Sequence, residues 1–302
     1  MKIIVTGSTG LIGSSLVPVL IAAGHTVTRF VRASSATEVV GTRAIAWNPS
    51  ANQIEKSEIE THDAVIHLAG ESVAEGRWTE DKKRRILESR VGSTKLLARA
   101  ISEATTRPRI YIGASATGFY GSERADEVLT EKSSKGADFL SNVVEQWEAA
   151  AQPITAAGVR SVFLRFGIVL SRDGGALAKL LTPFKLGAGG KLGSGAQYMS
   201  WIAIDDAIAA ILYALDDENL TGAVNVVAPH PVTNGEFTET LARVLHRPAV
   251  MSVPAFALRL AFGEMADAAL LKGQRVIPEK LEKSGFNFKY PTLEAALVSQ
   301  VA

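Results

Sequence analysis

Hydrophobic residues in the first half of the chain form short apolar runs that alternate with longer segments of helical periodicity. The short runs predict strands at Lys2–Thr6, Thr26–Val31, Arg43–Trp47, Ala64–Ala69, Arg109–Ser115 and Arg160–Leu170. The longer segments predict helices at Leu11–Ala23, at about Glu80–Ala104 and from about Gly136 to Ala157. Strands that alternate with helices in this way are typical of βαβ units, so the pattern predicts an α/β fold with a doubly wound parallel sheet.

After Leu170 the periodicity weakens. A glycine-rich stretch, Gly187–Gly195, is compatible either with a mobile lid over a substrate or with a passive connector. Further helical stretches are expected near residues 205–216, 234–246, 254–272 and 291–300. The second half of the chain is therefore expected to be smaller and less regular than the first.

Composition narrows the classes of function. The 302 residues carry 32 Lys and Arg against 31 Asp and Glu, so neither a nucleic-acid partner nor a membrane partner is expected. The chain has no cysteine, which excludes disulfides and thiolate catalysis, and its five histidines lack metal-type spacing, so no metal site is expected. Glycines interrupt the apolar N-terminal stretch before it reaches the length of a signal peptide or a membrane span, and a cytoplasmic location is expected.

The first strand runs into the pattern Gly7-x-x-Gly10-x-x-Gly13 and then into a helix. In such a loop the first glycine permits the tight turn, the second lets the backbone approach a pyrophosphate, and the third lets helix and strand pack closely. The N–H groups of the first helical turn then face the phosphates. The pattern predicts a dinucleotide site that includes Gly7, Ser8, Thr9, Gly10, Leu11, Ile12 and Gly13.

The end of the second predicted strand distinguishes between the two nicotinamide dinucleotides. NAD sites place an acidic residue there, whereas NADP sites have an arginine near the 2′-phosphate. Here Val31 and Arg32 are followed by no acidic residue before Glu38. The sequence therefore predicts NADP(H), with Arg32 at its 2′-phosphate. The alternative is that Arg32 is an ordinary surface residue.

Several motifs resemble those of extended short-chain dehydrogenase/reductases, in the same order. They are Ile3–Gly13, Asp63–Gly70, Ser89–Thr94, Ser115–Gly121 and Trp201–Asp206. More narrowly, Arg77-Trp78-Thr79, Trp147-Glu148, Arg165–Leu170 and Pro254-Ala-Phe256 are similar to an atypical subfamily described as nucleoside-diphosphate-sugar epimerase-like. The resemblance implies an NAD(P)-binding Rossmann fold over residues 1–230. It also implies a small C-terminal module of unknown function over residues 248–296, on the substrate side.

The resemblance also implies further cofactor contacts. Leu68, Ala69 and Gly70 would flank the adenosine, and Gly167, Ile168 and Val169 would pass beside the nicotinamide, where Ser115 would present a hydroxyl. Arg90 would hold a phosphate or ribose, with a surface ion pair as the alternative. Ser115 could also be a plain strand-end residue.

The usual catalytic pair of this superfamily is missing. Alcohol-oxidising and carbonyl-reducing members use Tyr-x-x-x-Lys, in which the ammonium lowers the pKa of the phenol. None of the five tyrosines of this chain is followed by lysine at that spacing. By alignment on Glu148, the tyrosine position falls at Phe139 or Leu140 and the lysine position at Val143 or Val144. Tyr120 is kept as a surrogate acid.

Two functions from different classes remain open. The first is an atypical NADP(H)-dependent oxidoreductase or epimerase-like enzyme, monomeric or homodimeric, that acts on an unknown small molecule, with a nucleotide sugar as one candidate. The second is a non-catalytic NADPH-binding regulatory or sensor protein. Candidate substrate contacts are Glu71, Arg77, Gln197 and Trp201, although a Trp such as Trp201 is more often part of a core.

Overall fold

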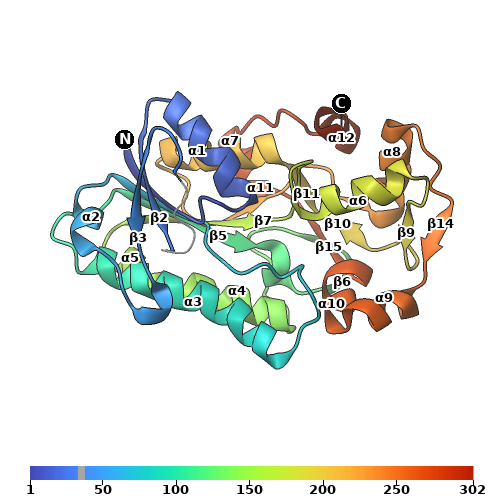
Figure 1. Cartoon of the computed structure of the whole chain (residues 1–302), viewed down its shortest axis with the longest axis horizontal. Coiled ribbons are helices and arrows are strands. Elements are labelled where there is room, and N and C mark those ends of the chain that lie inside the picture. The colour runs from blue at the N-terminus through green and yellow to red at the C-terminus, as the bar shows by residue number, and fades with distance from the viewer. Residues whose placement is uncertain (33–37, 302) are drawn as a thin grey trace.

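The computed structural model, which describes residues 1–32 and 38–301, is built around a seven-stranded parallel sheet (Figure 1). Its strands are β1 (Lys2–Thr6), β2 (Thr26–Val31), β3 (Thr42–Ala46), β4 (Ala64–His67), β5 (Ile110–Ala116), β7 (Arg160–Phe166) and β12 (Gly222–Val226). They follow the order β12-β7-β5-β4-β1-β2-β3, so the direction of winding reverses between β1 and β4. In such sheets ligands bind outside the carboxyl ends of the strands, at the point of reversal. The doubly wound sheet predicted from the sequence is confirmed.

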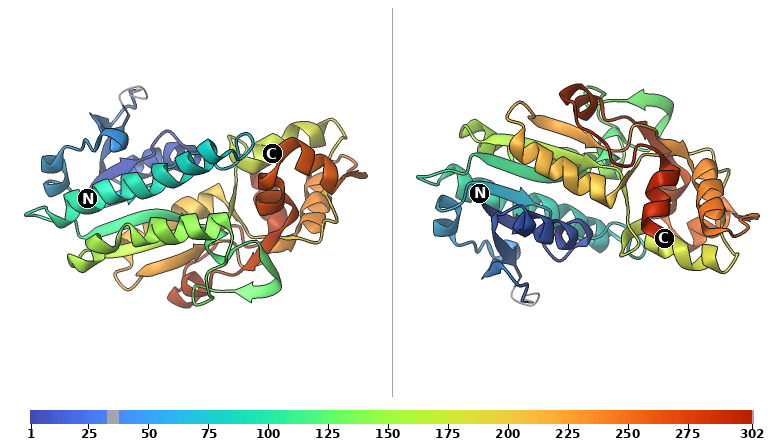
Figure 2. Two further views of the ribbon diagram at one scale, coloured as in Figure 1. Left: turned by 90° about the horizontal axis from the view of Figure 1, so that it is seen from below. Right: turned by 90° about the horizontal axis from the view of Figure 1, so that it is seen from above.

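Helices cover both faces of this sheet (Figure 2). Helices α1 (Leu11–Ala22) and α7 (Ile204–Asp216) pack on one face, where they bury residues such as Leu16 and Ile211. On the other face lie α2 (Lys56–Glu60), α3 (Glu80–Ser102), α4 (Phe139–Ala149) and α5 (Gln152–Ala156). Because both faces are covered, the central strands are apolar on both sides, which explains the nearly continuous hydrophobic run at β4.

A second apolar core lies beside the sheet and draws on segments from the latter half of the chain. Its helices are α6 (Gly175–Lys185), α8 (Asn234–Leu245) and α12 (Leu293–Val301), which bury Phe184, Phe237 and Leu297 around Trp201. The remaining helices are α9 (Ala255–Phe262), α10 (Glu264–Ala266), the π-helix η4 (Asp267–Leu271) and α11 (Glu279–Ser284), with the short 3₁₀ helices η2 (Pro49–Ala51) and η3 (Thr117–Tyr120).

Small two-stranded sheets lie outside the central sheet, and of their strands the sequence predicted only the stretch at residues 168–170. They pair β8 (Ile168–Leu170) with β11 (Trp201–Ala203), β9 (Gly190–Leu192) with β14 (Met251–Val253), β10 (Tyr198–Met199) with β13 (Val232–Thr233), and β6 (Glu123–Leu129) with β15 (Gly273–Val276). The continuous strand expected over Arg160–Leu170 is wrong. The chain leaves the central sheet at Gly167, where a Cβ would lie 2.3 Å from the Ser200 carbonyl oxygen.

The glycine-rich stretch Gly187–Gly195 contains strand β9, which pairs in parallel with β14 through Gly190 and Met251. A Cβ on Gly190 would lie 2.2 Å from the Met251 carbonyl oxygen, so the glycine allows the two backbones to approach closely. Of the two alternatives, this pairing favours an anchored connector over a mobile lid. Among the described residues, no helix is both long and apolar enough to cross a membrane.

Candidate functional site

The glycine loop between β1 and α1 is shaped by backbone packing at two of its glycines. Gly7 has φ +69°, and a Cβ there would lie 2.5 Å from the Leu68 carbonyl carbon. A Cβ on Gly13 would lie 2.2 Å from the carbonyl oxygen of Gly7. The first and third glycines are therefore required by the fold itself: they let β1, α1 and the segment after β4 meet at one point.

Gly10 and Ser8 differ from Gly7 and Gly13. No close packing contact within the protein requires a glycine at position 10, and no group of the protein pairs with the Ser8 hydroxyl. Gly10 has ordinary extended backbone angles as the N-cap of α1, and the nearest atom to a Cβ built there is the Gly7 carbonyl oxygen at 3.4 Å. Ser8 is buried, yet its Oγ has no hydrogen-bond partner. The first turn of α1 contains no acidic residue and presents free N–H groups. A small residue beside unpaired donors at a helix N-terminus is the arrangement that a phosphate group fits.

Arg32 follows the last residue of β2 and is exposed at the same carboxyl edge of the sheet as the glycine loop. Strand β2 pairs directly with β1, with Thr6 opposite Phe30. The position is therefore open to a ligand that extends from the loop toward β2. Residues 33–37, which follow Arg32, lie outside the described part of the chain.

The segment after β4 forms the other wall of the loop. His67, at the end of β4, is fully buried between Thr6 Oγ1 (2.6 Å from Nδ1) and Ser93 Oγ (3.1 Å from Nε2). Burial, with a further contribution from the charge of Arg90, lowers the pKa of His67 to about 3. A neutral imidazole thus links β1, β4 and α3 by hydrogen bonds, directly before the segment Leu68–Gly70.

The side chain of Arg90, on α3, packs against Gly70. Its Cζ lies 5.1 Å from the centre of the Trp147 ring, its Nη1 donates to the Ile86 carbonyl, and Cζ is 3.3 Å from a Cβ built on Gly70. Burial lowers its pKa to about 10, although Glu71 opposes the shift. In place of the surface ion pair considered as the alternative, the structure shows a stacked guanidinium beside the predicted adenosine segment.

Ser115 lies near the end of β5, in register with Arg165 on β7. Its Oγ donates to Glu148 Oε1 at 2.6 Å, and Arg165 donates to both oxygens of the same carboxylate at 2.8 Å each. The pair is bidentate and largely buried. The Ser115 hydroxyl is consequently held in one orientation by a carboxylate whose charge is balanced by a guanidinium.

Tyr120, the surrogate acid suggested by the sequence, is fully buried. Its hydroxyl donates to Asn225 Oδ1 at 2.7 Å and accepts from Arg165 Nη1 at 3.1 Å. Burial raises its pKa above the ordinary value despite the neighbouring Arg165. Both hydrogen-bonding capacities of the phenol are thus used within the protein, which favours a structural role for Tyr120.

The positions at which the sequence pattern expects the missing tyrosine and lysine lie on α4, largely within an apolar cluster. Phe139, Leu140 and Val143 pack with Trp78, with Ile86 and with residues of the C-terminal segment that include Met265. The rings of Trp78 and Phe139 are 5.4 Å apart. Val144 is also buried. The place of the usual catalytic pair is therefore filled by side chains of the loop before α3 and of α10 and η4.

The four predicted substrate contacts do not come together as one group. Glu71 accepts from Lys82 Nζ (2.8 Å) and Arg85 Nε (3.1 Å), and the first of these bonds is the main cause of its lowered pKa. Trp201 is a fully buried core residue. Gln197 donates to the Leu192 and Leu270 carbonyls, while its buried Oε1 has no hydrogen-bond partner.

Arg77 is the fourth of these residues, and it lies at the contact between the loop after β4 and the C-terminal segment. Its side chain is 3.4 Å from a Cβ built on Gly263, between α9 and α10. Nearby, Lys83 and Glu264 form an ion pair at 2.5 Å. From the opposite side, Lys179 on α6 donates to the Ala74 carbonyl of the same loop. The loop after β4 is thus in contact with α6 on the one hand and with the segment between α9 and α10 on the other.

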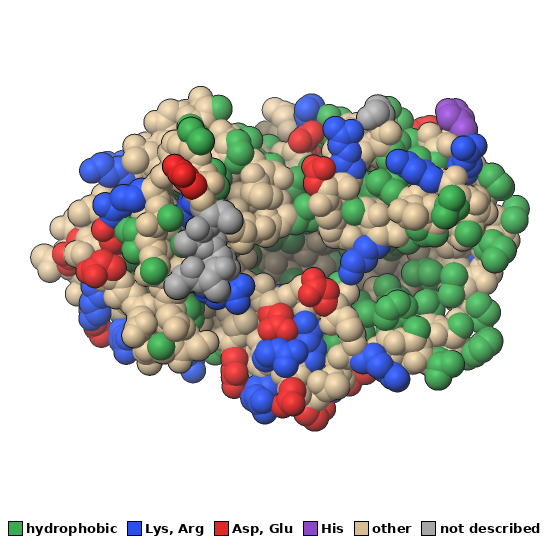
Figure 3. Space-filling view, in the orientation of Figure 1, with side chains coloured by type: hydrophobic (Ala, Val, Ile, Leu, Met, Phe, Trp, Pro, Cys, Tyr) green, Lys and Arg blue, Asp and Glu red, His purple; other side chains and the backbone are tan. Residues whose placement is uncertain are grey.

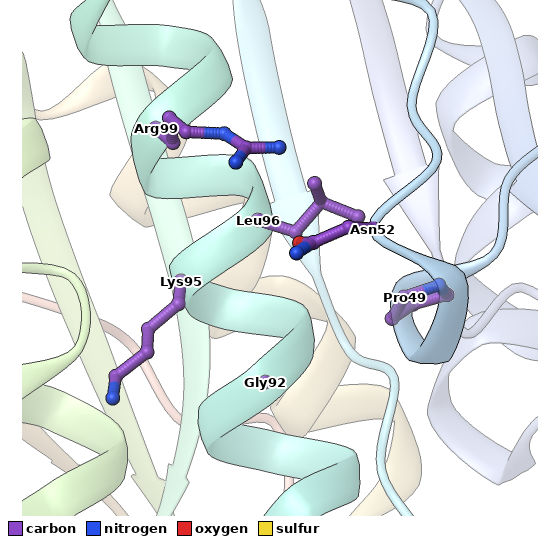
Figure 4. A pocket seen from close by; sticks show the side chains of 6 residues that line it. All are labelled: Pro49, Asn52, Gly92, Lys95, Leu96 and Arg99. Carbon is purple, nitrogen blue, oxygen red and sulfur yellow. The ribbon is translucent and has the colours of Figure 1, made fainter.

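The surface is hollowed between the part that carries α1 and α6 and the part that carries α3 and α10 (Figure 3). Two smaller cavities lie elsewhere. One, of about 400 Å³, lies between η2 and α3, where Asn52 and Arg99 point toward Leu96 while Lys95 points away (Figure 4). The other, of about 460 Å³, lies beside α4 and includes Phe119 and Glu148. Neither is lined by a residue of the glycine loop.

The polar groups that surround Ser115 were not predicted from the sequence. Arg165, Glu148 and Asn225 stand on three different elements, and Arg165 is opposite both Ser115 and Asn225 in register. A signal was present, because Arg165 is a charged residue between the apolar residues Leu164 and Phe166, and Glu148 follows a buried Trp. In the described part of the chain, no group of three or more His, Asp or Glu side chains is arranged to hold a metal ion.

Comparison with known proteins places these features in context. Residues 3–227 match the model of the NAD dependent epimerase/dehydratase family, and residues 253–299 match a domain of unknown function, DUF1731. Epimerase family protein YfhF of Bacillus subtilis is 40% identical over 302 residues, which cover 100% of this chain and 98% of that protein.

Two solved structures are similar over the whole chain. The human epimerase family protein SDR39U1 (isoform2) with NADPH has a TM-score of 0.89 at 35% identity, covering 99% of both chains. The nucleoside-diphosphate sugar epimerase from Corynebacterium glutamicum has a TM-score of 0.81 at 36% identity, covering 100% of this chain and 58% of that one.

Proposed function

The chain belongs to the NAD dependent epimerase/dehydratase family, and from that premise we propose that it is an NADP(H)-dependent oxidoreductase whose proton-transfer groups are not the usual Tyr and Lys. Its substrate would be a small molecule, with a nucleotide sugar as one candidate. A cytoplasmic location and a monomeric or homodimeric state are part of the same proposal. So is a division into a nucleotide-binding unit, residues 1–230, and a small C-terminal unit, residues 248–296.

The observation that carries the proposal is the pair formed by Gly10 and Ser8. Room for a ligand at Gly10 and an unpaired buried hydroxyl at Ser8 lie together at the N-terminus of α1. The N–H groups of this turn would bind the pyrophosphate, Arg32 would bind the 2′-phosphate, and Leu68–Gly70 would flank the adenosine. The human relative of similar structure is described with NADPH, which supports the choice of cofactor.

The cofactor supplies or accepts a hydride when it is bound. The protein's part is to orient the reacting group. We assign this role to Ser115, whose hydroxyl is fixed by Glu148 and Arg165, with Gly167, Ile168 and Val169 on the neighbouring strand end. Tyr120 is left out of this assignment because its hydroxyl is enclosed by Asn225 and Arg165.

Binding of NADPH tests the cofactor assignment directly. Gly10→Ala should weaken NADPH binding at least about tenfold, while the free energy of unfolding changes by less than about 1 kcal/mol, because the protein leaves room for the methyl group. Gly92→Ala, an exposed position on α3 with no atom within 4 Å of its Cβ, is the control. Unchanged binding in the Gly10→Ala variant would remove the main support for the proposal.

Choice between the two dinucleotides tests Arg32. Arg32→Asp should weaken NADPH binding at least about tenfold, because a carboxylate replaces the cation beside a phosphate, and should leave NADH binding nearly unchanged. Arg84→Asp, an exposed arginine on α3, serves as the control. Equal losses for NADPH and NADH would show that Arg32 does not read the 2′-phosphate.

A non-catalytic NADPH-binding regulatory protein is the second candidate. It is favoured by the apolar packing of Leu140 and Val144 at the positions of the missing pair. Stereospecifically deuterated NADPH, incubated with the protein and a metabolite extract, separates the two candidates. Transfer of deuterium into a product, lost in Ser115→Ala but kept in Ser102→Ala, would establish the enzyme. Tight NADPH binding without any transfer would favour the regulator.

A further inference from the structure

Large apolar side chains gather on the outside of the molecule where α9 and β14 lie. Exposed members are Leu186, Val250, Met251, Phe256, Leu260 and Phe262. Phe256 and Leu260, both on α9, are 71% and 75% exposed, so they project from the surface. Other exposed large hydrophobic residues, such as Val19 and Val128, are scattered singly. A group of this size on one surface normally contacts a partner.

The six side chains come from two segments that lie against each other. Leu186 directly follows α6, and the others fall between residues 250 and 262. Arg247 Nε donates to the Lys185 carbonyl at 3.0 Å, and β9 pairs with β14. Figure 3 shows hydrophobic side chains and Lys or Arg gathered at this end of the molecule, with few acidic ones. We refer to these six residues as the apolar end.

The two segments that form the apolar end carry cations but no acidic residue of their own. Segments 174–203 and 241–263, which supply all six apolar residues, contain no Asp or Glu, in a chain whose overall charge is nearly balanced. They contain the cations Lys179, Lys185, Lys191, Arg243, Arg247 and Arg259. Arg243 and Arg259 pair with acids from other segments. Among the described residues, the other four form no ion pair.

A second copy of this chain fits the apolar end poorly. A two-fold symmetric interface places one surface against itself, so the cations around it would face cations of the other copy. Like charges across an interface oppose association. A negatively charged partner surface would instead attract these cations. Side chains that project also suit a fluid boundary, into which they can insert without a preformed pocket.

We propose that the apolar end inserts Phe256, Leu260 and their apolar neighbours into the surface of a bilayer that contains anionic phospholipid. The unpaired lysines, Lys185 and Lys191 among them, would lie at the level of the charged headgroups. The nearly zero net charge of the whole chain led to the prediction of no membrane partner. It does not reveal that cations without nearby acidic residues in the sequence are concentrated in the two segments of the apolar end. The proposal concerns attachment to a membrane surface and requires no membrane-spanning helix.

Co-sedimentation with vesicles tests the proposal in the full-length protein. One set of vesicles contains phosphatidylcholine alone and the other contains phosphatidylcholine with phosphatidylglycerol. We expect binding to the second set to be at least about tenfold stronger, and to weaken as salt screens the cations. The double variant Phe256→Ser/Leu260→Ser and the double variant Lys185→Glu/Lys191→Glu should each lose at least about tenfold in binding.

Matched controls distinguish the apolar end from the rest of the surface. Val128→Ser/Val298→Ser removes exposed apolar side chains elsewhere, and Lys95→Glu/Lys132→Glu makes the same change in net charge. Both should bind vesicles like the unaltered protein, and every variant should keep its circular dichroism spectrum. The proposal is overturned if the unaltered protein binds neither set of vesicles, or if the controls lose binding as much as the test variants. It is also overturned if Phe256→Ser/Leu260→Ser dissolves a dimer in solution while vesicle binding is absent, because a second copy would then be the partner.

Discussion

The two ends of the proposed nucleotide site differ in what their residues are packed against. At the glycine loop, a buried hydroxyl without a hydrogen-bond partner and a glycine with room beside it lie at the N-terminus of α1. At α4, Leu140 and Val143 are covered by Trp78 and Met265. At the first end the protein leaves one polar group unpaired, whereas the second is packed by the protein's own C-terminal segment. Under the proposed function, the difference means that a dinucleotide site is kept while the expected positions of the usual acid–base pair are packed with apolar side chains.

The largest expected effect on stability comes from introducing a charge at a buried position of α4. Val144 is buried, so Val144→Lys would enclose an ammonium inside the protein and should lower the free energy of unfolding by about 3–5 kcal/mol. Urea unfolding measures the change, and Gln146→Lys, an exposed position on the same helix, should change stability by less than about 0.5 kcal/mol. A Val144→Lys variant as stable as the unaltered protein would mean that this end is open to water.

A smaller loss is expected at the glycine loop when its packing is disturbed. In Gly13→Ala the new methyl group would lie 2.2 Å from the Gly7 carbonyl oxygen and should lower the free energy of unfolding by about 2–3 kcal/mol. Thermal and urea unfolding would show the change, whereas Gly92→Ala should be neutral or slightly stabilising. If Gly13→Ala folds with full stability and loses only NADPH binding, then Gly13 serves the ligand in the way proposed for Gly10.

Acid should weaken the wall of the glycine loop through His67. In the unfolded chain this imidazole takes up a proton near pH 6.5, but in the folded protein its pKa is about 3. The unfolded state therefore binds more protons between these values, and stability falls as the pH is lowered, by up to about 1.4 kcal/mol per pH unit. Urea unfolding from pH 6.5 to pH 4 should show a shallower loss in His67→Gln, while His230→Gln, at an exposed position, should follow the unaltered protein.

The smallest expected effect concerns Tyr120. Tyr120→Phe would leave Asn225 Oδ1 and one Arg165 N–H without this partner and should cost about 1–2 kcal/mol of stability. Deuterium transfer from labelled NADPH, where it occurs, should be unchanged, because the hydroxyl is enclosed. Loss of transfer with stability intact would instead assign Tyr120 the acid role that the sequence suggested.

Much of the dinucleotide half could be predicted from the sequence. Strands β1 and β2 have the bounds expected from their apolar runs, and α1 differs by a single residue at its end. These elements are continuous in the chain, so the residues that decide them are close neighbours. The strand β12 was not predicted, because its sequence Gly-Ala-Val-Asn-Val is not a continuous apolar run, and it is a strand through its pairing with β7.

In the candidate site, too, some features could be predicted from the sequence and others could not. The glycine loop, Arg32 and the absence of Tyr-x-x-x-Lys are readable from the sequence, because each is a pattern of residues at fixed spacing. The bonds among Ser115, Glu148, Arg165 and Tyr120 are not, because they join residues from separate elements. Their existence depends on the register of β5 and β7 and on the position of α4 above them.

The sequence by itself therefore determined the class of fold, the glycine-rich turn between β1 and α1, and the absence of the usual catalytic pair. Only the tertiary structure decided what occupies the expected place of that pair, and that the exposed apolar residues of α9 and Leu186 lie at the same end of the molecule (Figure 1). The physical reason is the range of the interactions. Backbone angles and hydrophobic periodicity act between near neighbours in the chain, whereas burial and charge act between residues that are brought together only when the chain folds.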